Sequence, residues 1–233
     1  MHRFTGFPPT TLAFLRELRA NNNKPWFAAH HEEYQASYVE PAKQFVLAAG
    51  ERLRQFAPDV EAQPRILGSI FRINRDTRFS KDKTPYKDHL DLWFWEGERR
   101  EAVSGFFVRF TPEIVAVGAG CHGFAKQHLA DFRHALGTDA SGLKLAGIVK
   151  ALEKHGYQVG GRRYKRAPRG YSVGCEALEP LLLHDAMFVH CEEPADDALL
   201  SAEVVHNCVR HWSAFAPLHQ WLMRNVQNVR TGA

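Results

Sequence analysis

Apolar residues in the first sixty positions recur every three to four residues, which is the spacing of amphipathic helices. A first helix is predicted between a cap at Thr10 or Thr11 and the asparagine run at residues 21–23. Pro25 suits the first turn of a second helix, and Pro41 suits the first turn of a third. The beginning of the chain is therefore predicted to be helical.

From residue 66 onward the apolar spacing shortens towards two residues, which is typical of β-strands. The predicted strands are residues 69–74, 89–95, 102–110, a fourth beginning at 114, and a later one at 186–191, with the motif loop after the first strand and short turns between the next three. The other predicted elements are helices at 126–136 and 143–155, a hairpin turning at the glycines 160–161, a helical turn at 178–183, and a helical region from Ser201 that Pro217 breaks or kinks. Short turns favour antiparallel pairing. The prediction is an α+β fold with a central, largely antiparallel sheet, helices at both ends, and a single domain over residues 1–233.

The composition is that of an ordinary folded protein, with 233 residues, 45% hydrophobic and 24% charged. No apolar run approaches the roughly 18 residues of a membrane helix, and the N-terminus has no apolar core for a secretory signal. The four cysteines are widely spaced and include no CxxC pair, so neither a disulfide framework nor a zinc ribbon is indicated. A cytoplasmic location without a membrane partner is expected, and the oligomeric state is not indicated.

The strongest feature is the polar stretch at residues 72–88, which carries six cationic side chains against three acids. Guanidinium groups make planar, two-pronged contacts with phosphate or carboxylate, so the stretch predicts an oxyanion site, with phosphate as the favoured group. Asp76 is expected to orient one arginine, or to act as a general base if the protein is an enzyme, which the sequence leaves open. The predicted ligand-binding residues are Arg72, Arg75, Asp76, Arg78, Lys83, Tyr86, Lys87 and Arg169.

An ion-pair network is the alternative interpretation of the same stretch. Its three aspartates, Asp76, Asp82 and Asp88, can pair with three of the six cations and hold the loop against the sheet. Three cations remain without an acid from the stretch itself, so pairing explains only part of the pattern. Under this alternative the protein has a structural or interaction role.

The stretch also carries a motif, R-x-x-R-D-x-R-F-x-x-D-K-x-x-Y, with Arg72, Arg75, Asp76, Arg78, Phe79, Asp82, Lys83 and Tyr86 at its fixed positions. This motif resembles the signature of the DUF2461 family of bacterial and fungal proteins. The similarity extends to the opening F-T-G-F-P, the Trp26-Phe27 pair, the G-A-G near residue 120 and the P-R-G-Y near residue 170. The resemblance covers nearly the whole chain and implies a family without implying a mechanism.

A second basic segment, residues 160–171, interleaves five cations with Tyr164 and Tyr171 and contains no acid. Cations that follow a phosphate backbone, together with aromatic rings that stack on bases, are typical of nucleic-acid binding. One interpretation is therefore a nucleic-acid-binding module. The others are a solvated loop and a supporting wall of the anion site, to which Arg169 would contribute.

Other chemistry is only weakly indicated. The thirteen histidines show no convergent metal-ligating spacing, although His30 and Glu33 are three residues apart on a predicted helix, so no metal site is predicted. Cys121 follows a G-A-G turn, where a nucleophile with a lowered pKa is conceivable, but the family more often has tryptophan and then proline here, and a tight turn is expected. The spacing G-x-G-x-x-G at residues 118–123 lacks the βαβ setting of a dinucleotide site. No cofactor is predicted.

Overall fold

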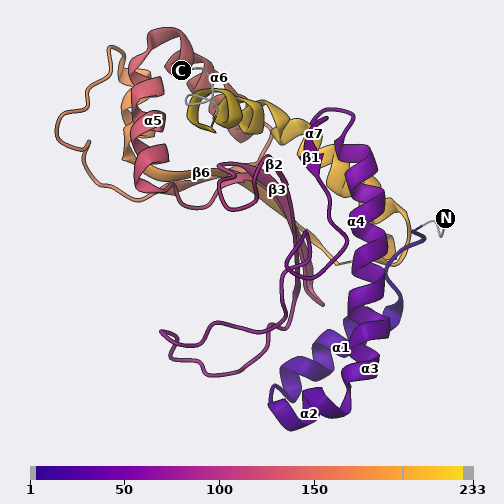
Figure 1. Ribbon diagram of the computed structural model, residues 1–233. Helices are drawn as coiled ribbons and strands as arrows, with labels where there is room; N and C mark the ends of the chain where they lie inside the picture. The colour runs from indigo at the N-terminus through magenta and orange to yellow at the C-terminus, as the bar shows by residue number, and fades with distance from the viewer. Residues whose placement is uncertain (1–3, 196, 228–233) are drawn as a thin grey trace. The chain divides into compact units, whose positions relative to one another are not determined.

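The computed structural model describes residues 4–195 and 197–227. The chain has an α+β fold, as the hydrophobic pattern predicts. The α-helices are α1 (Pro9–Ala20), α2 (Lys24–Ala29), α3 (His31–Tyr34), α4 (Glu40–Leu53), α5 (Lys126–Gly137), α6 (Asp139–Lys154) and α7 (Glu203–Leu222) (Figure 1). Two π-helical turns, η1 (Gln35–Val39) and η4 (Met223–Gln227), and two 3-10 helices, η2 (Glu176–Leu183) and η3 (Asp197–Leu200), complete the helical segments.

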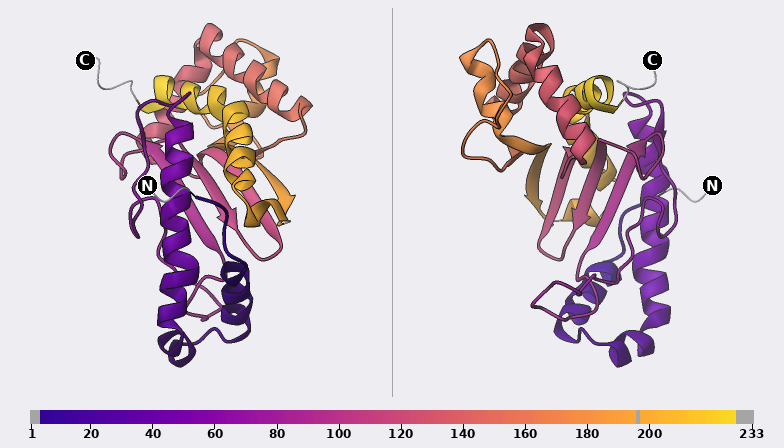
Figure 2. Two further views of the ribbon diagram at one scale, coloured as in Figure 1. Left: turned by 90° about the vertical axis from the view of Figure 1, so that its right-hand side faces the viewer. Right: turned by 60° about the vertical axis from the view of Figure 1, so that its left-hand side comes forward.

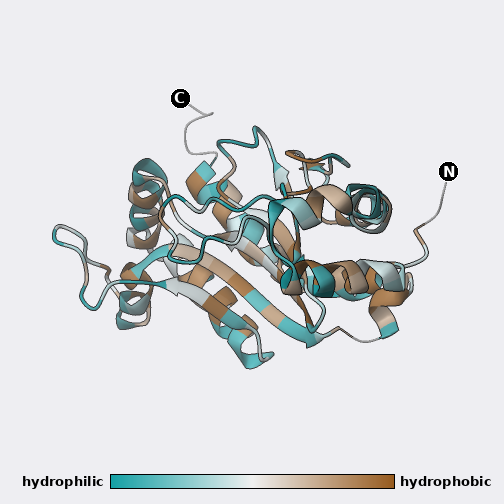
Figure 3. Ribbon diagram, turned by 90° about the horizontal axis from the view of Figure 1, so that it is seen from below, coloured by the Kyte–Doolittle hydropathy of each residue, from teal (hydrophilic) through white to brown (hydrophobic). Residues whose placement is uncertain are grey.

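One antiparallel sheet contains six strands in the order β1-β2-β3-β4-β6-β5. They are β1 (Val60–Glu61), β2 (Leu90–Glu96), β3 (Gly105–Phe110), β4 (Ile114–Cys121), β5 (Gln158–Arg162) and β6 (His184–Pro194). Figure 3 shows hydrophobic and hydrophilic residues alternating along the strands, as a two-residue period requires. In β2 the alternate residues Leu90, Leu92 and Phe94 are buried, while Asp91 and Trp93 between them are only half-buried.

The contacts within the chain define two units. The first contains Met1–Phe94, Phe107–Val117 and Glu192–Arg210, and the second contains Trp95–Phe106, Gly118–Cys191 and His211–Ala233. Strands β2, β3, β4 and β6 each have residues in both units. The expectation of a single domain stays a prediction.

The N-terminal helices differ from the prediction in detail. Helix α1 begins at Pro9 after an extended Pro8, so neither threonine is its cap; Thr11 is buried and its hydroxyl donates to the Ser37 carbonyl. The predicted helix from Pro25 to about Tyr38 is divided into α2, α3 and η1, because His30 leaves the helical backbone conformation (φ −109°, ψ 22°). This break determines where the His30 side chain points.

The predicted strand at residues 69–74 is wrong. Among the described residues this segment forms isolated bridges instead of a strand: Ile70 with Ile66 and with Leu92, and Asn74 with Tyr86. The segment instead begins a long loop that closes on itself, since the Arg75 amide donates to the Pro85 carbonyl at 2.9 Å and the Lys87 amide donates to the Ile73 carbonyl at 2.8 Å. Residues 69–74 contain one charged side chain, Arg72, and bury Ser69, Ile70 and Ile73, but their backbone meets β2 at an isolated bridge and two hydrogen bonds (Phe71 amide to Asp91 carbonyl, Trp93 amide to Ser69 carbonyl) rather than along a continuous ladder.

The predicted hairpin at Gly160-Gly161 is also wrong, because β5 runs through both glycines and pairs with β6. A Cβ atom on Gly160 would lie 2.3 Å from the Phe188 ring, and Gly161 has a φ of +104° at a register shift. The glycines therefore serve close approach and a bulge rather than a turn. Pro217 lies inside α7, which continues past it, so the predicted break is absent.

Each unit has its own aromatic core. In the first unit the rings of Phe7, Phe45 and Phe110 meet at centroid distances of 4.8 to 5.5 Å, which packs α4 against β3. In the second unit Phe132 packs on Trp221, whose indole N–H donates to the Ser141 carbonyl at 3.0 Å. Full burial of one such side chain contributes about 1.5–3 kcal/mol, so each cluster stabilises the unit that contains it.

Candidate functional site

The motif residues form one long loop in the first unit, which Figures 1 and 2 show extending beside α1 and α2 without a helix or strand of its own. We divide it into the loop tip, residues 72–84, and the loop base, residues 85–91. The two parts contain similar residue types. Their partners differ.

Tyr86 fixes the loop base to the helices. The Asn22 side chain accepts a hydrogen bond from the Tyr86 amide at 3.0 Å and donates to the Tyr86 carbonyl at 2.9 Å. The Tyr86 ring, which is 8% exposed, stacks on Phe27 with the centroids 4.1 Å apart. Tyr86 thus has the contacts of a packing residue between the loop and α2.

Asp91 on β2 interacts with three basic side chains at the loop base. Its carboxylate accepts hydrogen bonds from Lys87 at 2.9 Å and Arg109 at 2.6 Å, and it lies 3.3 Å from the His89 ring. Burial raises the pKa of Asp91, but the hydrogen bond and charge of His89 and the hydrogen bond of Arg109 outweigh burial and hold the pKa well below its usual range. Lys87 also lies over the Phe71 ring, 5.0 Å from its centroid.

Arg19 on α1 joins the loop base to a turn between two strands. Its guanidinium binds Asp88 at 2.7 Å and Glu113 at 2.8 Å. Asp88 therefore pairs with a cation from outside the motif. The partners at the base come from α1, α2 and β3, far away in the sequence.

The loop tip is held by its own residues. Asp76 binds the Arg78 guanidinium in a two-pronged pair, with Nε 2.9 Å from Oδ1 and Nη2 2.6 Å from Oδ2. The hydrogen bonds from the Arg78 side chain and amide lower the pKa of Asp76 to about 2. A carboxylate with so low a pKa is a weak base at neutral pH, so its predicted role as a general base gains no support.

Two further contacts shape the tip. Arg75 pairs with Asp82 and also bonds the Thr84 hydroxyl. The Thr84 amide and the Arg75 side chain lower the pKa of Asp82 to about 2. Lys83 donates to the Thr77 carbonyl at 2.8 Å, which orients the ammonium group without neutralising it.

Three cations of the tip have no carboxylate partner among the described residues: Arg72, Lys81 and Lys83. All three are exposed. Phe79 lies among them in the sequence and is 94% exposed, with the Arg78 guanidinium 5.8 Å from its ring centroid. Phe79 was not predicted as a site residue, although the sequence shows an aromatic residue between cations.

The second basic segment belongs to the second unit, so Arg169 and the loop tip lie in different units. Arg169 is exposed. Arg133 lies 5.5 Å from the Tyr164 ring centroid and 5.1 Å from that of Tyr171, so an arginine of the chain already occupies a position against both rings. The segment borders an open groove of about 570 Å³ with both basic and acidic lining, including Arg162, Arg166, Glu176 and Glu179.

Nucleophilic catalysis gains no support from two further groups of the second unit. Burial raises the pKa of the Cys121 thiol to about 11, so little thiolate is present at neutral pH. Ser104 bonds His219 at 2.9 Å, and His219 lies 3.4 Å from Glu96, but Ser104 and His219 are each 1% exposed. A serine so deeply buried is out of reach of a substrate.

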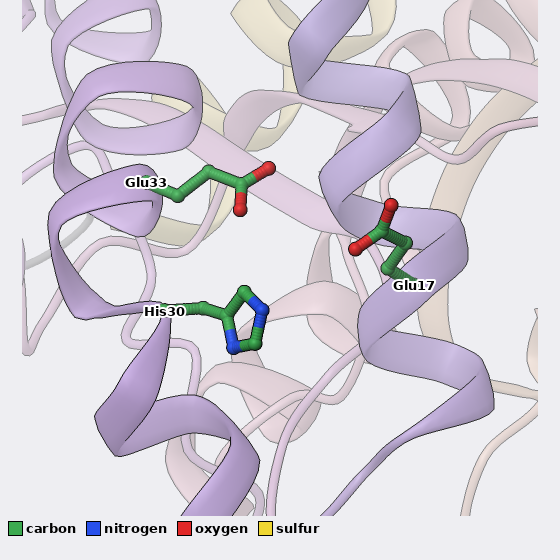
Figure 4. A group of neighbouring side chains, drawn as sticks. All are labelled: Glu17, His30 and Glu33. Atoms are coloured by element: carbon green, nitrogen blue, oxygen red, sulfur yellow. The ribbon is translucent and has the colours of Figure 1, made fainter.

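One group of side chains among the described residues has a geometry that fits a metal ion: Glu17, His30 and Glu33. One ligand atom from each lies within 4.8 Å of the others, and Figure 4 shows the three side chains pointing toward a common space. Glu17 comes from α1, and the other two come from the break between α2 and α3 and from α3 itself. The sequence showed His30 and Glu33 but gave no indication of Glu17, which is thirteen residues earlier.

Comparison with protein families gives one match. A family model described as "Conserved hypothetical protein (DUF2461)" matches residues 10–221, nearly the whole chain. Comparison with curated proteins gives no match, and comparison with solved structures gives none either. Among the described residues, no helix combines the length and the apolar character that crossing a membrane requires.

Proposed function

The chain belongs to the DUF2461 family, and from that premise we propose that it binds a phosphate-bearing small molecule, specifically a nucleotide, at the loop tip. The observation that carries this proposal is the combination of three exposed cations without carboxylate partners and an aromatic ring that is 94% exposed. Single apolar residues are common on protein surfaces. A phenylalanine exposed on a loop among cations has the features of a stacking platform for a base.

The proposed roles follow from the chemistry of each side chain. Arg72 makes a two-pronged contact with a phosphate group, and Lys81 and Lys83 supply point charges beside it. Phe79 stacks on the base, with Arg78 contributing a cation at the ring. Asp76 keeps Arg78 in place through their paired hydrogen bonds.

The remaining predicted ligand residues receive a supporting role in this proposal. Arg75 shapes the tip through Asp82 and Thr84, and Tyr86 and Lys87 hold the base. Arg169 takes no part. We assign no reaction, because a set of cations stabilises a developing anion but supplies no nucleophile.

A cytoplasmic location is part of the proposal, since nucleotides are abundant there and none of the four cysteines, all of them described residues, forms a disulfide. Nucleic acid is the second partner to consider, because cations and an exposed ring also suit a single strand. A single strand would make many phosphate contacts, so its affinity would fall steeply with salt. Binding of a mononucleotide would depend on salt much less.

The test is a thermal-shift screen of nucleotides, sugar phosphates, pyrophosphate and a short oligonucleotide. A ligand at a hundred times its Kd adds about 2.7 kcal/mol, which raises the melting temperature of a protein of this size by about 5–10 °C. We expect a nucleotide to give such a shift in the wild type and in Arg52→Ala, an exposed arginine of α4, but not in Arg72→Ala.

Other outcomes contradict the proposal. A shift with the oligonucleotide alone would favour nucleic-acid binding. No shift with any compound, together with a lower melting temperature for Arg78→Ala, would favour the ion-pair network.

A further inference from the structure

We propose that Glu17, His30 and Glu33 form a binding site for a divalent transition-metal ion, Zn²⁺ or Mn²⁺. All three residues belong to the first unit. The inference does not depend on the nucleotide proposal, because it rests on other residues. It is carried by the donor set, by the orientation of His30 and by the charge of the two carboxylates.

The backbone brings the three donors together. The non-helical conformation at His30 separates α2 from α3, and Glu33 follows one turn later. Glu17 faces them from α1 (Figure 4). The ligand atoms lie within 4.8 Å of one another, whereas donors around a metal at about 2.1 Å are about 3.0–3.4 Å apart. Glu17 is exposed, so rotation of its side chain can close this difference.

The hydrogen bond and ring contact of His30 prepare one nitrogen for a metal. Nδ1 lies 2.8 Å from the Trp26 carbonyl oxygen, and because a carbonyl only accepts, Nδ1 carries the proton. The lone pair of the neutral ring is therefore on Nε2. The ring also stacks on Trp26, with centroids 4.0 Å apart and an interplanar angle of 14°. A backbone carbonyl that holds the other ring nitrogen is the usual support of a metal-binding histidine.

The two carboxylates lack a cation from the chain. Neither Glu17 nor Glu33 forms an ion pair with any described residue. Arg19, close to Glu17 on α1, is already bound to Asp88 and Glu113. Two like charges this close repel each other, so a bound cation would stabilise the arrangement.

The donor set selects the kind of ion. One imidazole nitrogen and two carboxylates suit Zn²⁺, Mn²⁺ and related ions, whereas Ca²⁺ and Mg²⁺ prefer oxygen donors alone. Three protein ligands leave at least one coordination position for water or a ligand. The site therefore resembles an open metal site rather than a closed structural one.

The test is titration of the metal-free protein with Zn²⁺ and with Mn²⁺ by isothermal calorimetry. We expect one saturable site in the wild type, and affinity at least about tenfold weaker in Glu33→Gln and in Glu17→Gln, because each amide removes a charged ligand of nearly unchanged shape. The matched control is Glu32→Gln, which changes a neighbouring exposed glutamate of α3 outside the group and should leave the affinity within about twofold.

Circular dichroism establishes that each variant is folded, so a loss of binding reports on the ligands. Two results would overturn the inference. One is the absence of saturable binding, which would mean that the three side chains do not hold a metal ion. The other is equal affinity in the wild type and both ligand variants, which would assign the metal to scattered surface histidines.

Discussion

The base and the tip of the motif loop contain the same kinds of charged residue and are stabilised in different ways. At the base, Asp91 binds Arg109, Asp88 binds Arg19, and Tyr86 bonds Asn22, so these three contacts join the loop to other elements. At the tip, Asp76 binds Arg78 and Asp82 binds Arg75, so the contacts remain inside the loop. The contacts of the base attach the loop to the fold, whereas the contacts of the tip stabilise only the conformation of the tip.

This difference separates the two interpretations of the motif. The ion-pair network describes the base, where burial and partners distant in sequence make each contact part of the fold. It accounts for the tip only in part, because Asp76 and Asp82 pair with arginines there but three cations, Arg72, Lys81 and Lys83, form no ion pair with a carboxylate among the described residues. Substitutions at the base should therefore lower stability, and substitutions at the tip should lower ligand affinity with stability retained.

Tyr86→Ala has the largest expected effect. Removing a buried aromatic ring that stacks on Phe27 should lower the free energy of unfolding by about 3–4 kcal/mol, measured by urea denaturation. Tyr86→Phe keeps the stacked ring and should cost less than about 1 kcal/mol. A loss below about 1 kcal/mol in Tyr86→Ala would contradict a structural role for the base.

Asp91→Asn tests the charge at the base. The substitution leaves Lys87, His89 and Arg109 without their shared carboxylate, and since Arg109 is partly exposed we expect a loss of about 2 kcal/mol at pH 7.

The same variant gives a pH dependence of known sign. The pKa of Asp91 is lower in the folded state than in the unfolded chain, so its contribution is fully present above the unfolded pKa of about 4 and is lost as the pH falls through the folded value. The difference in unfolding free energy between wild type and Asp91→Asn should therefore shrink as the pH decreases below about 4. A difference that is constant from pH 7 to pH 3 would contradict this account.

Arg78→Ala should change stability much less. Its pair with Asp76 is exposed, and solvent screens exposed ion pairs so that they contribute little to stability, so the urea midpoint should hardly move. Arg52→Ala, which changes an exposed arginine of α4, is the reference for an arginine without such a partner. A loss above about 2 kcal/mol would show that the tip is as structural as the base.

Arg169→Ala has the smallest expected effect. This exposed residue belongs to the second unit, and the proposed nucleotide site is built only from the loop tip. The Kd for a nucleotide, measured by calorimetry, should stay within about twofold of the wild type, since no proposed contact is removed. A tenfold weaker affinity would restore the original prediction that Arg169 contributes to the anion site.

Local patterns predicted much of the fold. The alternation along β2 and the helical spacing around α4 to α6 identified the α+β class, because these elements depend mainly on which face is buried. The prediction was wrong where close tertiary contacts determine which residue type is present. The glycines of β5 are an example, because their backbone lies directly against the Phe188 ring and leaves no room for a side chain. It was also wrong for residues 69–74, whose buried backbone meets β2 at an isolated bridge and two hydrogen bonds instead of a continuous ladder.

The sequence predicted which segment carries the candidate site, but not which side chains contact one another in it. The charge pattern showed that some cations of the motif would lack an acidic partner. It did not show which ones, because Lys87 pairs with Asp91 and Asp88 pairs with Arg19, and both of these partners lie outside residues 72–88. Glu17 joins His30 and Glu33 only through the packing of α1 against the following helices. Residues that only tertiary packing brings together cannot be identified from their spacing in the sequence.

The most direct test of the central claim compares the binding of ATP and of inorganic tripolyphosphate by the wild type and by Phe79→Ala. Phe79 is 94% exposed, so its removal should leave the fold unchanged. Loss of base stacking, at about 1–3 kcal/mol, should weaken ATP binding by about 5- to 150-fold, while the Kd for tripolyphosphate should stay the same. If Phe79→Ala binds ATP as tightly as the wild type does, or if neither protein binds ATP, the loop tip is not a nucleotide site.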